Sequence, residues 1–222
     1  MLKPRKRISR QQIKEDKLIT FTAKASEFYS RHSRNILAAT GIGIVLVVIV
    51  GFFINSRAQA EKAATFDLTL AKVEIGQRNY ENAAQKLAEI VENYSGTRAA
   101  GDALFFLGNV HIDQRNYEQA RDELNKYLDR YGNDPQFASS AIAGLGFIDE
   151  QEKQYREAAE KYLEAANKYP REYNAPQYLL NAGRCFALAG DLSNARETYK
   201  KILDIYPESD LKQKAEDEMN RW

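Results

Sequence analysis

Residue types that build reaction centres are scarce in this sequence. It has a single cysteine, Cys185, and two histidines, His32 and His111. One cysteine excludes an intramolecular disulfide, so packing alone must stabilise the fold. Neither histidine has a second histidine, a cysteine or a carboxylate at the spacing of a metal site, so we expect no metal ion.

Enzyme motifs are missing as well. The sequence contains no glycine-rich phosphate loop, no G-x-S-x-G nucleophile elbow and no catalytic pattern of paired carboxylates. We therefore expect no enzymatic activity, no cofactor and no small-molecule substrate. Cys185 lies in an apolar stretch, which predicts a buried core side chain. His111 is expected to be packed with its hydrogen bonds satisfied, and the acidic cluster at 149–152 to be a solvated helix face.

Charge is absent from one long stretch, residues 36–54. As a helix rising about 1.5 Å per residue, these 19 residues span roughly 28 Å, which matches a bilayer core of about 30 Å. The stretch is longer than the apolar region of a signal peptide, and 35 residues precede it. We therefore favour an uncleaved transmembrane signal anchor over a signal peptide cleaved at Ala58-Gln59-Ala60.

The charge of the chain is distributed unevenly. Residues 1–35 contain ten Lys and Arg against three acids, a net charge of +7, whereas the remaining 187 residues sum to −6. A short basic tail resists translocation, so we expect it in the cytoplasm and the C-terminal 168 residues in the periplasm or outside the cell. The tail has few aromatic residues for base stacking. We expect it to contact the inner-membrane surface and not nucleic acid.

A repeat dominates the rest of the sequence. The string Gln-Arg-Asn-Tyr-Glu occurs at 77–81 and again at 114–118, and weaker copies follow. A fixed period of this length is typical of arrays in which each unit buries its apolar face only against its neighbours. The anchor positions of the four copies, each followed three residues later by an alanine, are Tyr80, Tyr117, Tyr155 and Leu192.

Within each unit the pattern predicts a helical hairpin. When units are numbered from residues 64, 101, 139 and 176, apolar side chains at positions 4, 7 and 11 form the stripe of a first helix. A small residue at position 8 and alanine at position 20 allow a close approach of the second helix, and large residues at 24 and 27 fill the space between hairpins. Gly190, Asn79 and Asn116 are expected to form the left-handed turns. No strand alternation occurs in 56–222, so the fold class is all-α.

This pattern resembles the tetratricopeptide repeat, most clearly at 104–131 and 179–207. Three or four extra residues between units, expected to be linkers, are similar to the bacterial envelope subclass of that family. This subclass includes the single-pass ancillary subunit of the SecYEG translocon, the Tol-Pal coordinator and a barrel-assembly lipoprotein.

The resemblance implies a domain plan for the whole chain. A basic tail (1–35) and a transmembrane helix (36–54) precede a solenoid of about four repeats (55–207, with units 64–97, 101–134, 139–172 and 176–209) and a capping helix (208–222). Ser209-Asp210 is the N-cap candidate of the capping helix. Residues 56–74 are expected to continue from the membrane helix and to cap the other end of the array.

In the tetratricopeptide superhelix, positions 2, 5, 9 and 12 of each first helix line the concave face. The resemblance therefore implies a peptide-binding groove with apolar side chains and two polar handles, Asn109 and Arg184. The Lys/Asn/Arg clamp that reads C-terminal carboxylates is missing, which disfavours that class of partner. The predicted groove residues are Phe105, Asn109, Ile112, Phe147, Leu180 and Arg184.

The resemblance implies a membrane-anchored scaffold for protein–protein interactions. The expected partners are translocon subunits and periplasmic chaperones. The alternatives are envelope-assembly proteins of cell division or outer-membrane maintenance, or a lipid- or cell-wall-binding role.

Overall fold

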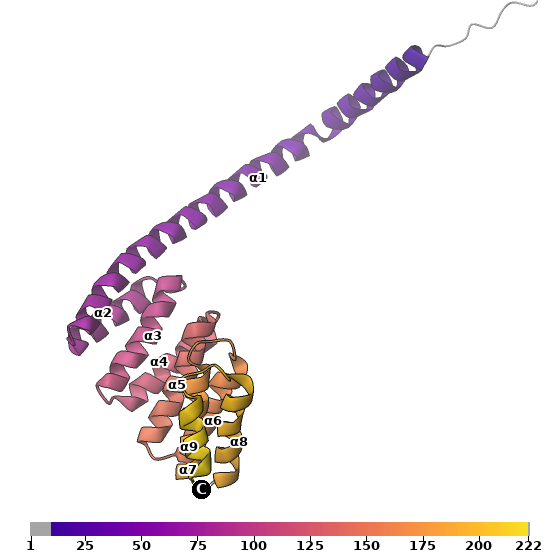
Figure 1. Cartoon of the computed structure of the whole chain (residues 1–222). Coiled ribbons are helices and arrows are strands. Elements are labelled where there is room, and N and C mark those ends of the chain that lie inside the picture. The colour runs from indigo at the N-terminus through magenta and orange to yellow at the C-terminus, as the bar shows by residue number, and fades with distance from the viewer. Residues whose placement is uncertain (1–9, 222) are drawn as a thin grey trace, which may run out of the picture. The chain divides into compact units, whose positions relative to one another are not determined.

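The computed structural model describes residues 10–221, with side chains from residue 19, and its regular structure in that range is entirely α-helical (Figure 1). The chain divides into two compact units, residues 1–57 and 58–222, and each is described by itself. The helices are α1 (Arg10–Gly76), α2 (Tyr80–Asn93), α3 (Arg98–Asp113), α4 (Tyr117–Arg130), α5 (Pro135–Gln151), α6 (Tyr155–Lys168), α7 (Ala175–Leu188), α8 (Leu192–Ile205) and α9 (Lys212–Asn220).

The first unit contains the N-terminal part of α1. This helix includes an 18-residue window that is apolar and long enough to cross a membrane, and none of that window is buried. Large apolar side chains such as Val47 and Phe52 are 71% and 69% exposed. The first nine residues of the predicted basic tail lie outside the described range.

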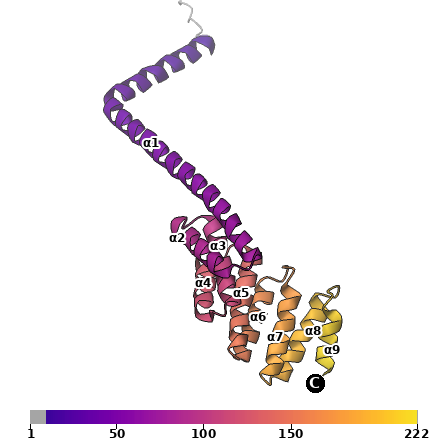
Figure 2. The same cartoon turned by 90° about the vertical axis from the view of Figure 1, so that its left-hand side faces the viewer.

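The second unit is a row of helical hairpins. The C-terminal part of α1 packs with α2, and Ala64, Leu68 and Ala71 meet Leu87 and Ile90 in one apolar cluster. The pairs α3–α4, α5–α6 and α7–α8 follow as further hairpins, which lie side by side in both views (Figures 1 and 2). The predicted all-helical array is thus confirmed.

The helices of a hairpin approach each other closely where the repeat places small residues. A methyl group added at Gly108 would lie 2.8 Å from Cδ2 of Leu124. One added at Gly183 would lie 2.5 Å from the ring of Tyr199. The carbonyl oxygen of Ala120 lies 3.5 Å from the added methyl group at Gly108, and that of Ala158 lies 3.1 Å from one added at Gly146. These alanines, like the others at position 20, are completely buried. The predicted pairing of positions 8 and 20 is therefore confirmed.

The turn inside each hairpin ends the first helix with a left-handed residue. In the first turn the N–H of Asn79 donates to the carbonyl of Glu74, and the N–H of Arg78 donates to that of Ile75, a Schellman motif. Gly190 takes the left-handed conformation as predicted, but the prediction for Asn79 and Asn116 is wrong. In the other turns the left-handed residues are Arg78, Arg115 and Lys153, with φ of 61°, 62° and 63°.

Side-chain caps lengthen the first helices of the second and third hairpins. The hydroxyl of Thr97 accepts from the N–H of Ala100, and the carboxylate of Asp134 accepts from the N–H of Gln136. Pro135 then occupies the first helical position, which it favours. Helices α3 and α5 therefore begin inside the segments predicted to be linkers, at Arg98 and Pro135, and part of each of these linkers is helical.

The two ends of the array differ. At the C-terminal end Leu211, Ala215 and Met219 pack on the last hairpin, as expected of a capping helix. Helix α9 begins at Lys212, and the hydroxyl of Ser209 accepts from the N–H of Leu211 just before it. At the N-terminal end α1 is continuous through Gly76. Its outer face there is apolar and exposed, so the prediction that it caps this end is wrong.

Candidate protein-binding surfaces

One side of the first helices is not covered by other helices of the array. It consists of positions 2, 6, 9 and 13 of each unit, whose spacing of four, three and four residues places them along one stripe of a helix. We call this surface the first-helix face. Its members, all exposed or half-buried, are Thr65, Thr69, Lys72, Gly76, Asp102, Phe106, Asn109, Asp113, Ser140, Gly144, Phe147, Gln151, Gln177, Asn181, Arg184 and Leu188.

Three of the predicted groove residues lie on this face. Phe147 is 37% exposed, and the side chain of Arg184 is 46% exposed. Asn109 is half-buried, and its amide donates to the carbonyl of Phe105 at 2.8 Å, one turn earlier in α3. All three occupy position 9, which Lys72 occupies in the first unit.

Phe105 and Leu180 do not lie on this face, because they are only 8% and 4% exposed. The prediction that both are exposed is wrong. Position 5 points into the space between hairpins, where the ring of Phe105 stacks on that of Phe137 at 4.7 Å. Ile112, at position 12, is half-buried and packs beside Gly144 of the next first helix.

Arg184 is engaged by a neighbouring helix. Its two terminal nitrogens donate to the two carboxylate oxygens of Glu150 at 2.8 and 2.7 Å, a bidentate pair between α7 and α5. These hydrogen bonds hold the pKa of Glu150 below its usual value. Arg184 is therefore not the free polar handle that the sequence suggested, and a ligand would meet the Glu150–Arg184 pair as a unit.

A second ion pair links α4 to α5. Arg121 donates to Asp149 at 2.7 Å and to Glu152 at 2.9 Å. Asp149 is only 4% exposed, so the prediction of a solvated acidic face at 149–152 is wrong. The carboxylates of this segment instead join three successive hairpins.

The apolar part of the first-helix face is discontinuous. The half-buried ring of Phe106 is covered by the ammonium group of Lys72, 4.3 Å from its centroid. Phe147 and the 53% exposed Leu188 are the large apolar side chains that remain accessible. Such a surface suits a peptide with one or two apolar anchors and polar groups between them.

Cys185 and His111 were both predicted to be packed side chains, and the structure agrees fully for the first and only in part for the second. Cys185 is fully buried as predicted, and burial raises the pKa of its thiol to about 12. His111 is packed as predicted, but its Nδ1 has no hydrogen-bond partner, so the expectation of a satisfied side chain is wrong. Burial lowers the pKa of His111.

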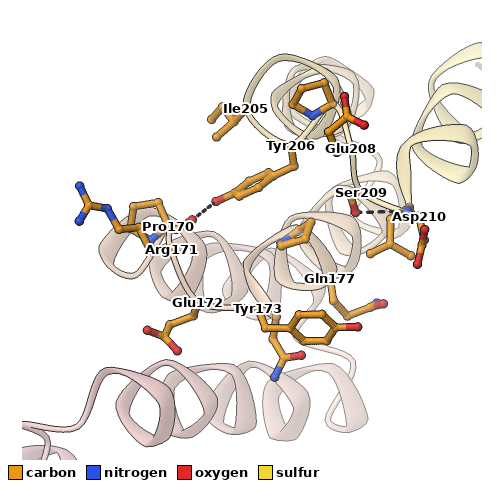
Figure 3. A pocket seen from close by; sticks show the side chains of 14 residues that line it. Pro170, Arg171, Glu172, Tyr173, Gln177, Ile205, Tyr206, Glu208, Ser209 and Asp210 are labelled. Atoms are coloured by element: carbon orange, nitrogen blue, oxygen red, sulfur yellow. Dashed lines mark hydrogen bonds between the residues drawn. The ribbon is translucent and has the colours of Figure 1, made fainter.

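A cleft of about 650 Å³ lies between the α6–α7 and α8–α9 linkers (Figure 3). The hydroxyl of Tyr206 donates to the carbonyl of Pro170 at 2.8 Å and connects the two linkers at one end of this cleft. Tyr173 is 93% exposed beside Gln177, and Ile205 is 55% exposed. Sequence reasoning missed this site, although the tyrosine–proline pairs at 169–170 and 206–207 mark both linkers.

Comparisons with known proteins agree with this geometry. The profile of the tetratricopeptide repeat matches residues 68–135 and 150–210, more than half of the chain. The chain therefore belongs to the tetratricopeptide-repeat family. A sequence search of curated proteins gave no match.

Several solved structures share the fold. MamA (residue 41 to the end) from Desulfovibrio magneticus RS-1 is 16% identical with a TM-score of 0.54, over 71% of this chain and 92% of that one. PilF from Pseudomonas aeruginosa is 21% identical with a TM-score of 0.54, over 75% and 68%. YrrB, a TPR protein with an unusual peptide-binding site, is 22% identical with a TM-score of 0.52, over 70% and 75%. At these identities the likeness concerns the fold alone.

Proposed function

We propose that this chain is a single-pass inner-membrane scaffold that presents its tetratricopeptide repeats outside the cytoplasm and binds protein segments there. The observation that supports the anchor is the exposure of the apolar helix. From Ile42 to Ile54 its large apolar side chains are 45–71% exposed. A soluble protein rarely exposes an apolar patch above a few hundred Å², whereas a bilayer would cover this one.

The proposed partners are proteins at the Sec translocon, with periplasmic chaperones as the ligands of the repeats. Anchoring in the membrane plane raises the effective concentration of a weak surface contact, which suits the small accessible apolar area of the first-helix face. The competing proposal is a coordinator of cell division or outer-membrane maintenance. A lipid- or cell-wall-binding module that uses the basic tail is a third.

The proposed binding site is the first-helix face around Phe147, with the Glu150–Arg184 pair beside it. An exposed aromatic ring next to a fixed ion pair gives a ligand both an apolar contact and an orienting charge. Phe147→Ala should weaken capture of the partner while the helical content is retained. The matched control is Tyr173→Ala, because Tyr173 is the exposed aromatic of the linker cleft.

Topology and partners are tested separately. Protease added outside spheroplasts should digest the repeats and spare the N-terminal tail; protection of the repeats would overturn the proposed orientation. Affinity purification from detergent-solubilised membranes, followed by mass spectrometry, should recover translocon subunits and periplasmic chaperones. Recovery of division or outer-membrane maintenance proteins in their place would favour the competing proposal. Loss of capture in Tyr173→Ala but not Phe147→Ala would move the site to the linker cleft.

A further inference from the structure

The first hairpin exposes apolar side chains that the other hairpins bury. Phe66, Leu70 and Val73 of α1 are 64%, 43% and 51% exposed. They occupy positions 3, 7 and 10 of their unit. The residues at the same positions of the next three units are all at most 7% exposed: Ala103, Leu107 and Val110, then Ala141, Leu145 and Ile148, then Tyr178, Ala182 and Cys185. In those units the preceding hairpin covers these positions, and the array starts without one.

A head-to-tail contact between copies would not cover this row. The opposite end of the array is already closed by α9, whose Ala215 is fully buried against the last hairpin. Two copies can therefore pair through this row only by joining their N-terminal hairpins to each other. A contact between the same surface of two copies is two-fold symmetric.

The row has the spacing of a parallel coiled coil. Ala63, Phe66, Leu70 and Val73 follow one another at intervals of three, four and three residues, the pattern of heptad positions a and d. At 100° per residue this seam lies about 150° around the helix from the side that packs on α2. Pairing through it would leave the hairpin intact.

The flanking charges are complementary in the same arrangement. Lys62 and Asp67 fall at positions g and e, five residues apart, where residues of opposite charge face each other across a parallel dimer. Lys62 is exposed. One carboxylate oxygen of Asp67 accepts from the hydroxyl of Tyr94 at 3.0 Å, and the other can accept from a partner.

We propose that two copies of this chain pair in parallel through Ala63, Phe66, Leu70 and Val73 of α1. The parallel sense agrees with the proposed membrane anchor, which would orient all copies alike; in this respect the inference rests on the proposed function. Four side chains per copy cover less than the roughly 800 Å² per partner of a standard interface. We therefore expect the dimer to form in the membrane, where anchoring raises the effective concentration of the two copies.

Cysteine cross-linking of the full chain in its native membranes tests this pairing. The native thiol of Cys185 is fully buried, so it does not compete. Phe66→Cys and Leu70→Cys should each give a disulfide-linked dimer under mild oxidation. The matched control is Thr65→Cys, an exposed position one residue away on another side of α1, which should give none.

Two differently tagged copies, expressed together, identify the partner. A cross-linked band that contains both tags supports the pair, whereas cross-linked bands that never contain both tags would mean that another protein covers the row. Equal cross-linking at Thr65 and Phe66, or no cross-linking at Phe66 and Leu70, would also overturn the proposal.

Charge reversal tests the parallel register. Lys62→Glu should lower the yield of the Leu70→Cys cross-link, because exposed like charges repel by a modest amount, and Lys62→Glu with Asp67→Lys should restore it. An undiminished yield in Lys62→Glu would overturn the parallel register. Fractionation of the same samples separates this question from the anchor: a cross-linked dimer in the soluble fraction would refute the anchor and leave the pairing intact.

Discussion

Variants of Phe105 and Phe147 allow stability and binding to be tested separately in this molecule. Both are phenylalanines on first helices, and both were expected to bind a peptide. The structure buries Phe105 between hairpins at 8% exposure and leaves Phe147 at 37% on the first-helix face. We predict that Phe105→Ala unfolds the array more easily and that Phe147→Ala weakens partner capture.

The magnitudes follow from the surroundings of each ring. Phe105 stacks on Phe137 and lies 5.7 Å from the ring of Tyr127, so its removal leaves a cavity that costs about 3–5 kcal/mol. Complete burial of a phenylalanine contributes about 1.5–3 kcal/mol. Because more than a third of Phe147 is already exposed, its truncation should cost only about 1–2 kcal/mol of stability. If it is a binding anchor, capture should weaken by about 2 kcal/mol, roughly 30-fold.

Two assays on the full chain in detergent measure these effects. Urea unfolding followed by circular dichroism gives the stability of each variant, and a titration with the purified partner gives the affinity. Phe105→Ala should have the lower urea midpoint, and Phe147→Ala the weaker binding. Equal losses of stability would refute the assignment of position 5 to the interior. Unchanged binding in Phe147→Ala would refute the role of the first-helix face.

Four further substitutions test the turns, the packing and the pH dependence of stability. Lys153→Gly should raise the free energy of unfolding by about 1 kcal/mol, because a left-handed residue with a side chain is strained, and Gly190→Ala should lower it by a similar amount. A decrease for Lys153→Gly or an increase for Gly190→Ala in urea unfolding would contradict the turn geometry. Ala158→Leu should overpack the hairpin by about 1–3 kcal/mol, and an unchanged melting temperature would refute the register. His111 has a lowered pKa, so the unfolded chain binds its proton more readily and stability should fall as the pH drops from 7.5 through the ordinary histidine value of about 6.5. His111→Phe should reduce that fall between pH 7.5 and 5.5, and an identical pH dependence of the melting temperature in both proteins would show that His111 does not contribute.

The hairpin contacts were predictable because the same local contact occurs four times. Small residues such as Gly108 and Ala120 recur together at the same two positions of each unit. This recurrence indicates from the sequence alone that the two helices of a hairpin pack closely at these positions. The burial of Cys185 was predictable from the apolar stretch in which it lies. Each of these inferences depends on residues within one unit.

Two of the four predicted groove positions, 5 and 12, are displaced by one residue from the first-helix face. Phe105 and Phe106 are both aromatic, and one step along a helix rotates a side chain by about 100°, so composition alone does not say which of them points outward. The sequence contains a signal nonetheless. Position 5 is apolar in every unit, as Leu180 and Leu68 show, whereas position 6 varies from Phe106 to Asn181. Uniform apolar character marks the interior.

The contacts between units were the hardest to foresee. Glu150 and Arg184 are 34 residues apart, and each has other charged residues nearby in the sequence. The left-handed conformation of Arg115 was also hidden, because the backbone of the Schellman turn imposes it whatever the side chain. Such features depend on how one hairpin is placed on the next, which the sequence of a single unit does not specify.

The carboxylate of Glu61 has a mechanical consequence. Its two oxygens accept from the N–H groups of Arg98 and Ala99 at 2.7 and 3.0 Å, at the positive end of α3. The hydroxyl of Tyr94 holds Asp67 of the same first helix. Tension applied along the C-terminal part of α1 would load these three hydrogen bonds at the same time, in shear. Hydrogen bonds that are loaded together resist more force than hydrogen bonds that break one after another. The first two hairpins should therefore yield as one element when the chain is pulled from its N-terminal side, and force spectroscopy of Glu61→Ala should show them yielding separately.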